Sequence, residues 1–237
     1  MKQYRLGILG GMGPQATNTF YQYILDRTDA ANDQGHVNTL ILSDSNMPDR
    51  TTAILSGNTQ PVFERLLEDA RLLERAGCTV LAVPCNTSHY FLDEVQKHVQ
   101  IPILNMIRET ARSLIGQDLK RPGILATDGT IRTGLYQKEF EKLGITAVAP
   151  SPKAQQLVMS LIYDDIKAGR DGDPQKFAAI HRDLLEQGCD CGVLACTELS
   201  VFSASHHLPP FYTDAMEVLA QRAILSCHKP LRGFLLH

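Results

Sequence analysis

The fold is decided by the stretch Val80-Leu81-Ala82-Val83-Pro84-Cys85-Asn86-Thr87, in which an apolar segment runs directly into a cysteine followed by small polar residues. The stretch Val193-Leu194-Ala195-Cys196-Thr197-Glu198 repeats this arrangement 113 residues further along the chain. Nearly the same offset places Gly7-Ile8-Leu9 on Gly123-Ile124-Leu125. We interpret the chain as one α/β unit used twice, with a cysteine at the same place in each copy.

Length and composition predict a soluble globular protein with two related halves. The chain has 237 residues, of which 43% are hydrophobic and 21% are charged, and such values are ordinary for globular proteins. A net charge of −3 gives no electrostatic reason to expect nucleic acid or an anionic membrane as a partner. No apolar run approaches the ~18 residues of a transmembrane helix, and the N-terminus leads directly into a strand-like segment. We therefore predict a cytoplasmic protein with no nucleic-acid and no membrane partner.

Apolar runs and turn residues predict alternating strands and helices along the whole chain. In the first half we expect strands at 4–9, 37–42, 79–83 and 101–104, and helices at 17–29, 61–76 and from 86 or 87 to about 99. In the second half we expect strands at 123–126, 146–149 and 192–195, and helices at 134–143, 154–168, 174–187 and from 214 to about 227. This order predicts an α/β fold of two pseudo-symmetric, doubly wound parallel-sheet domains.

Two of the six cysteines stand out because each lies where a strand is expected to end and a helix to begin. These two are Cys85 and Cys196. Disulfides are rare in cytosolic proteins, and the C-x-C spacing at residues 189–191 has no second pair to complete a zinc site. The other four are therefore interpreted as small apolar fillers, namely Cys78, Cys189, Cys191 and Cys227.

Cys85 and Cys196 are candidate acid/base groups. The carboxyl ends of the strands face the ligand crevice in an open α/β sheet, and a helix N-terminus is expected to lower the pKa of a thiol. A substrate carbon held between the two sulfurs requires them to be roughly 7 Å apart. One thiolate could then remove a proton from one face while the opposite thiol delivers one to the other, which is the geometry of racemisation. The alternative is a pair of buried structural cysteines.

The turn after the first strand leaves three interpretations open. Gly11-x-Gly13-x-x-Ala16 resembles a dinucleotide-binding fingerprint. Pro14 lies inside this turn, however, and the acidic residue at the end of the second strand, Asp44, comes about thirty residues after Gly13 instead of about twenty. The turn could equally present backbone amides to a carboxylate, or it could be purely structural.

Four motifs taken together resemble the aspartate/glutamate racemase family, in the same order and across the whole chain. They are Gly10-Gly11-Met12-Gly13-Pro14, Pro48-Asp49-Arg50, Pro84-Cys85-Asn86-Thr87-Ser88-His89 and Cys196-Thr197-Glu198. The resemblance implies a cofactor-independent, two-base racemase of acidic amino acids that uses neither PLP nor a metal. It also implies a homodimer and an active site between two domains. We expect these domains to be residues 1–104 with 211–237, because the C-terminal helix returns to the first domain, and residues 105–210.

The resemblance also assigns roles to individual residues. Cys85 and Cys196 match the two catalytic acid/bases. The residues that match the cradle for the substrate α-carboxylate and amine are Met12, Asn86, Thr87 and Ser88, with Thr127 and Thr130 as their counterpart in the second half. Arg50 resembles the residue that binds the distal carboxylate, and Lys167 the lysine that approaches from the second domain. Two fixed cations suit a dicarboxylate substrate.

The expected function is the interconversion of L- and D-aspartate, with glutamate as a possible substrate. Three alternatives are a related dicarboxylate isomerase such as maleate isomerase, a binding module that holds aspartate without turnover, and a nucleotide-dependent oxidoreductase. Glu198 could either cap the second helix or polarise Cys196. His89 is interpreted as a packing or surface residue, and the sequence leaves the role of Asp214 open.

Overall fold

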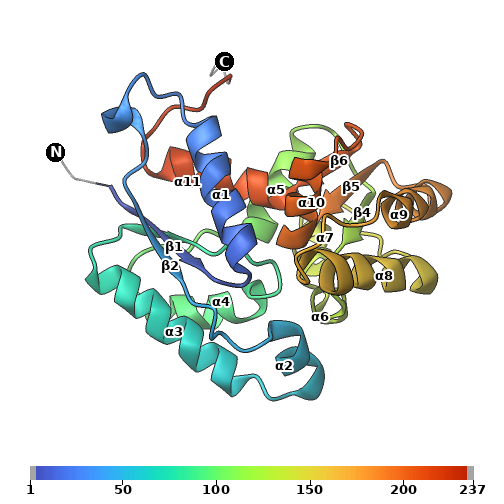
Figure 1. Ribbon diagram of the computed structural model, residues 1–237, viewed down its shortest axis with the longest axis horizontal. Coiled ribbons are helices and arrows are strands. Elements are labelled where there is room, and N and C mark those ends of the chain that lie inside the picture. The colour runs from blue at the N-terminus through green and yellow to red at the C-terminus, as the bar shows by residue number, and fades with distance from the viewer. Residues whose placement is uncertain (1–3, 234–237) are drawn as a thin grey trace.

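The computed structural model describes residues 4–233, which form two halves that are each built on a parallel sheet (Figure 1). The first sheet has the order β2-β1-β3 and contains β1 (Leu6–Gly10), β2 (Thr39–Ser43) and β3 (Val80–Ala82). The second has the order β4-β5-β6 and contains β4 (Pro122–Leu125), β5 (Cys191–Leu194) and β6 (Tyr212–Asp214). All paired strands are parallel. The predicted α/β fold of two related halves is therefore confirmed.

Helices connect the strands and pack on the sheets (Figure 1). The first half contains α1 (Pro14–Arg27), the 3₁₀ helix η1 (Asp33–Gly35), α2 (Arg50–Ser56), α3 (Gln60–Arg75) and α4 (His89–Gln96). The second contains α5 (Met106–Ile115), α6 (Asp128–Thr133), α7 (Leu135–Glu141), α8 (Pro152–Met159), the π-helix η2 (Ser160–Ile166), α9 (Pro174–Glu186) and α10 (Thr197–Ser205). The helix α11 (Ala215–Ser226) follows β6.

The strand β1 fixes the position of the first turn. All five of its residues are buried, as expected of a parallel strand covered on both faces. The turn that follows begins at Gly11, which has a φ of +89°. A Cβ atom at this position would lie 2.3 Å from the backbone carbonyl carbon of Asp44, so only glycine fits. The turn is thus held against the end of β2, which places Met12 at the carboxyl edge of the sheet.

Two of the predicted strands are reduced to single bridges at the sheet edges. The segment at 101–104 pairs with β3 only through Ile103 and Leu81, and the segment at 146–149 pairs with β4 only through Val148 and Gly123. Their predicted positions are right, but their predicted length is wrong, because each segment forms a β-bridge at one residue only. β6 is a strand that the sequence does not predict, and it pairs with β5.

The helix α11 joins the two halves. It packs against α1 and β3 of the first half and against α5 and β5 of the second. Its side chains Leu219 and Ile224 belong to one apolar core that also contains Ile8 of β1 and Val193 of β5. Residues 212–214 lie in the second sheet, whereas α11 contacts both halves. The expected domain boundaries stay a prediction.

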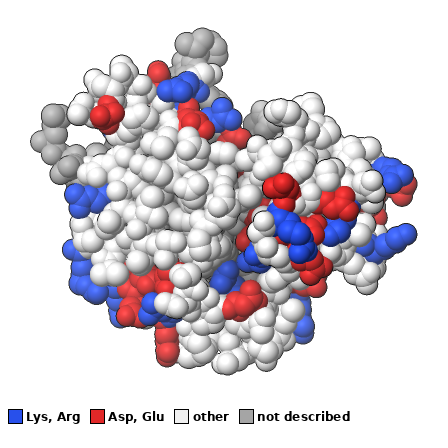
Figure 2. Space-filling view, viewed as in Figure 1, with Lys and Arg blue, Asp and Glu red and all other residues white. Residues whose placement is uncertain are grey.

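The surface carries balanced charge on the face drawn in Figure 2. Lys and Arg side chains lie among Asp and Glu side chains there, around wide uncharged areas, and no extended region of one sign is visible. Among residues 4–233, no helix combines the length and the hydropathy that a membrane span requires.

Candidate active site

Residues from both halves enclose a small cavity. Its lining contains Met12, Asp49, Arg50, Thr51, Cys85, Asn86 and Thr87 from the first half, and Thr127, Tyr163, Lys167, Cys196, Thr197 and Glu198 from the second. Its volume is about 10 Å³, which is room for about one water molecule. Eight of the ten predicted site residues therefore meet in one place, and the other two, Ser88 and Thr130, lie directly behind the lining.

The two cysteines reach this cavity from equivalent strands. Cys85 follows β3 and Cys196 follows β5, and each residue is only 5% exposed. Cys196 is the N-cap residue of α10. Cys85 is farther from a helix, because α4 begins at His89 and has Ser88 as its N-cap. The expectation that a helix starts directly after each cysteine is thus correct for Cys196 and wrong for Cys85, where residues 86–88 form a turn.

The pKa of the Cys196 thiol is raised well above its usual value, which corrects the expectation of a lowered pKa. Burial is the main cause, and the nearby carboxylate of Glu198 is the second. The ammonium of Lys167 and the backbone N–H of Glu198 act in the opposite direction but are outweighed. Removal from water penalises the charged thiolate, so the helix N-terminus does not dominate here.

Arg50 is a buried cation fixed at the start of α2. Its Nη2 donates to the carbonyl of Met12 at 3.2 Å, and its Nη1 donates to the carbonyls of Pro48 at 3.0 Å and Met47 at 3.4 Å. Burial on its own would lower the pKa of Arg50, but the interactions with Cys85, Asp49 and Glu198 together outweigh it and raise the pKa. The buried Nε has no hydrogen-bond partner within residues 4–233. Arg50 therefore retains one unused donor beside Cys85.

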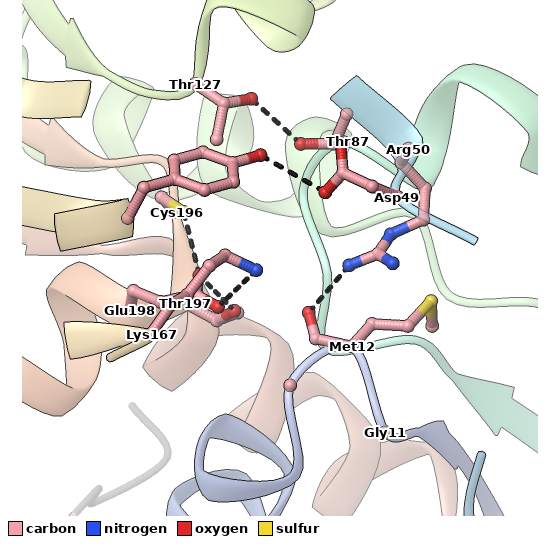
Figure 3. Close-up of polar contacts among 12 residues, drawn as sticks. Gly11, Met12, Asp49, Arg50, Thr87, Thr127, Lys167, Cys196, Thr197 and Glu198 are labelled. Carbon is pink, nitrogen blue, oxygen red and sulfur yellow. Dashed lines mark hydrogen bonds and ion pairs between the residues drawn. The ribbon is translucent and has the colours of Figure 1, made fainter. Parts of the chain in front are cut away.

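Thr87 forms hydrogen bonds that join the two halves at another side of the cavity. Its hydroxyl lies 3.0 Å from those of both Thr127 and Thr130, and the contact with Thr127 is drawn in Figure 3. The neighbouring Asn86 accepts a hydrogen bond from Tyr136 through Oδ1. Its buried Nδ2 has no partner among the described residues. These side chains supply hydroxyl groups and a free amide donor that could bind a carboxylate.

Ser88 and Met12 support this side of the cavity from behind. The hydroxyl of Ser88 donates to the Met12 sulfur at 3.2 Å. The Met12 carbonyl in turn accepts from Arg50. The predicted cradle of the first half is therefore one connected unit, in which the glycine turn, the segment after β3 and the start of α2 hold one another.

Lys167 and Glu198 face the first half from the opposite side. The Lys167 ammonium lies 3.1 Å from Glu198 Oε1 and 5.2 Å from the centre of the Tyr163 ring. In Figure 3, Lys167 and Arg50 point toward each other across the middle of the site. The Tyr163 hydroxyl donates to Asp49 at 3.3 Å and so provides a second contact between the halves. The two cations thus flank one space, one from each half.

Several residues that line the cavity are not predicted from the sequence. Tyr163 precedes Lys167 by four residues, and this helical spacing places both on one face. Asp49 caps α2 by accepting from the backbone N–H of Thr52 at 2.7 Å, a common role of an aspartate before a helix. Both signals are present in the sequence, but neither shows that the two side chains meet across the cavity.

Asp214 lies outside the cavity and ties three elements together. It accepts hydrogen bonds from the Ser200 hydroxyl at 2.7 Å, from the Tyr23 hydroxyl at 3.1 Å and from the backbone N–H of Met216 at 2.8 Å. Burial raises its pKa to about 6. Its role, which the sequence leaves open, is to cap α11 and to hold α1 and α10 together.

His89 fixes the backbone that carries Cys85. It is buried, its Nδ1 lies 2.9 Å from the Cys85 carbonyl oxygen, and its Nε2 accepts from the Met106 N–H at 3.0 Å. These contacts define the neutral tautomer with the proton on Nδ1. Of the two expectations, packing residue is right and surface residue is wrong.

Neutral His89 is expected to make the folded state sensitive to mild acid. Burial lowers its pKa from 6.5 to about 4, so between these values the unfolded chain takes up a proton that the folded chain does not. Stability should therefore fall by roughly 2–3 kcal/mol between pH 7 and pH 4.5 through this residue alone. Urea unfolding at the two pH values measures the loss. His89→Gln should lose less on acidification, and an identical loss in both proteins would show that His89 is not responsible.

The chain is similar in sequence to a known family and to known amino-acid racemases. The profile of the family described as Asp/Glu/Hydantoin racemase matches residues 9–223. The broad specificity amino-acid racemase RacX of Bacillus subtilis is 28% identical over 199 residues, which cover 82% of this chain and 86% of that protein. A glutamate racemase of a Picosynechococcus species is 30% identical over 129 residues, or 53% of this chain and 44% of that one.

A solved structure shares both the fold and the length of the chain. Picrophilus torridus aspartate racemase superposes with a TM-score of 0.82 at 30% sequence identity, over 97% of this chain and 96% of that chain. The likeness therefore extends over both halves and includes the segments that line the cavity.

Proposed function

Because the chain belongs to the Asp/Glu/hydantoin racemase family, we propose that it interconverts L- and D-aspartate with two cysteine acid/bases and no cofactor. The observation that carries this proposal is that Cys85 and Cys196, from opposite halves, line one cavity together with the cations Arg50 and Lys167. Such a cavity can offer an acid/base group to each face of one carbon. Two cations suit a substrate with two carboxylates.

In the proposed reaction, one cysteine removes the Cα proton as a thiolate. The C–H bond breaks, an S–H bond forms on that cysteine, and the electron pair moves into the α-carboxylate. The opposite thiol then gives its proton to the other face of the carbon and becomes a thiolate. Fixed hydrogen-bond donors must stabilise the charge that develops on the carboxylate. The unpaired Nδ2 of Asn86 and the hydroxyls of Thr87 and Thr127 support this role.

Aspartate is the favoured substrate because the site is compact. The cavity of about 10 Å³ must widen for any amino acid, and aspartate, which is one methylene shorter than glutamate, needs less widening. Arg50, held by three carbonyl groups, offers its free Nε to the distal carboxylate. The aspartate racemase from Picrophilus torridus, alike over nearly its full length, supports the same substrate. Arg50 and Lys167 are the proposed ligands of the distal carboxylate.

A larger neighbouring cavity is the proposed route of entry. It has a volume of about 560 Å³ and lies against the start of α1 and the segment 166–171. Lys167 and Glu198 line both cavities. Separation of this ion pair would connect the two spaces, so a substrate carboxylate that binds Lys167 could help to open the site.

A substrate panel analysed by chiral chromatography tests the proposal. Purified protein is incubated separately with L-aspartate, L-glutamate, L-asparagine and maleate, without added PLP. L-aspartate is expected to yield equal amounts of both enantiomers, faster than glutamate, while asparagine and maleate change little. Formation of fumarate from maleate would favour the isomerase alternative. Calorimetric binding of aspartate without any D-aspartate would instead indicate a binding module.

The broad-specificity relative makes glutamate a necessary member of this panel. The glutamate racemase from Picosynechococcus matches only about half of the chain, so it supports the reaction type more than the substrate.

We also propose that the protein is a homodimer with a cytoplasmic location. Exposed Leu40 and Ile41 on the edge strand β2 support self-association, and a mass of 26.2 kDa by light scattering would contradict it.

A further inference from the structure

Glu198 makes direct contact with one of the two proposed acid/base groups. The Cys196 thiol donates to Glu198 Oε2 at 2.9 Å, and the Thr197 hydroxyl donates to the same oxygen at 3.3 Å. The other carboxylate oxygen, Oε1, binds the Lys167 ammonium at 3.1 Å (Figure 3). Glu198 is buried, so solvent weakens these interactions little. Both carboxylate oxygens of Glu198 therefore have partners, one the Cys196 thiol and the other the Lys167 ammonium.

The two thiols have neighbours of opposite charge. Cys85 interacts with the guanidinium of Arg50, whereas the Cys196 thiol donates a hydrogen bond to the carboxylate of Glu198. The titratable groups around Cys196 come from several elements, and they are Glu198 on α10, Lys167 and Tyr163 at η2, Tyr136 on α7, and Cys85 with Arg50 across the cavity. Of these groups, only the carboxylate of Glu198 accepts the thiol proton in a direct hydrogen bond.

We propose that Glu198 is a positioning residue that keeps Cys196 protonated and aimed at the substrate, so that in the resting enzyme Cys196 is the proton donor and Cys85 the base, and the reverse direction starts from the opposite protonation state. This inference rests on the proposed function. A carboxylate beside the sulfur opposes a second negative charge at that place. When Cys196 gives up its proton, the thiolate formed beside Glu198 is stabilised mainly by Lys167. Before the next turnover in the same direction Cys196 regains a proton from solvent, and Cys85 releases to solvent the proton that it took from Cα. Glu198 thereby sets one resting protonation state.

The substitution Glu198→Gln removes the negative charge of the side chain but keeps its shape. Glutamine is nearly the same size and can still accept the thiol hydrogen bond, but it no longer opposes a thiolate. The pH at which Cys196 loses its proton should therefore fall by at least about one unit. The alkaline limb of kcat/KM for aspartate should move down by the same amount, because Cys196 must carry a proton to act as the donor. Glu198→Asp keeps the charge and should leave the alkaline limb near its original position, even if the rate falls.

The deciding measurement does not depend on activity. The protein is labelled with ¹³C at the cysteine Cβ, the Cys196 signal is assigned with Cys196→Ser, and the signal is followed by NMR as the pH is raised. We expect Cys196 to titrate at lower pH in Glu198→Gln than in the wild type or Glu198→Asp. Equal titration midpoints in all three proteins would overturn the proposal. A shifted midpoint in a protein that racemises no amino acid would support this role of Glu198 and refute the proposed function.

Discussion

Replacement of either Cys85 or Cys196 by serine is expected to lower kcat/KM for aspartate by about 10³-fold or more. A serine hydroxyl has nearly the size of a thiol but hardly ionises near neutral pH, so it cannot remove the Cα proton. It is also a much weaker proton donor to a carbanion. General acid–base groups typically contribute 10²–10⁴-fold, and the reaction needs one such group on each face. The rate of D-aspartate formation measures the effect.

Cys189→Ser is the matched control for these two variants. Cys189 is a buried free thiol in an apolar cluster of the second half, and it does not line the cavity. The same chemical change at this position should affect stability more than turnover. If Cys85→Ser or Cys196→Ser racemised at the wild-type rate, that cysteine would have no place in the mechanism. A similar loss in all three variants would indicate a folding defect instead.

Arg50→Gln is the second change with a large expected effect. Hydrogen bonds to charged groups are worth about 1.5–3 kcal/mol, so loss of the guanidinium should lower kcat/KM for aspartate by roughly 10–10²-fold. Most of the loss should appear as a higher KM, because the distal carboxylate is bound in the ground state as well as in the transition state. Initial rates over a range of aspartate concentrations measure both constants.

The substitution Arg50→Lys tests whether the positive charge alone is sufficient at this position. Lysine keeps the positive charge but cannot offer the planar set of donors of a guanidinium, so it should restore only part of the activity. Thermal unfolding of both variants shows whether the three carbonyl groups that hold Arg50 still pack correctly. A KM unchanged in Arg50→Gln, in a folded protein, would remove Arg50 from substrate binding.

The sequence predicts the architecture well because the repeat is carried by buried strands. β1, β3 and β5 are apolar throughout, and a turn or a cysteine follows each. Short edge segments are harder to predict. The segments around Ile103 and Val148 pair at one residue each, and local composition does not reveal where pairing stops. The helices α2, α5 and α6 and the strand β6 are missed. Three of them, α2, α6 and β6, are short, and the position of each depends on packing against distant elements.

The site could be assembled from the sequence only in part. Resemblance to a family predicts which residues meet, and eight of the ten predicted residues line the cavity. The electrostatics could not be predicted, because they arise from contacts between halves. A helix N-terminus suggests a lowered pKa for Cys196, yet burial and Glu198 raise it. The contacts of Lys167 with Glu198 and of Tyr163 with Asp49 likewise join segments that are far apart in the chain.

The most direct test of two thiols on opposite faces of one carbon is racemisation of unlabelled L-aspartate in D₂O, followed by mass spectrometry of the separated enantiomers during the first turnovers. The exchangeable proton of each thiol is then deuterium. The account predicts that every D-aspartate molecule formed carries deuterium at Cα, while the remaining L-aspartate is still largely unlabelled. D-aspartate that retains its original hydrogen would contradict it, because a single base would then have carried the proton from one face to the other.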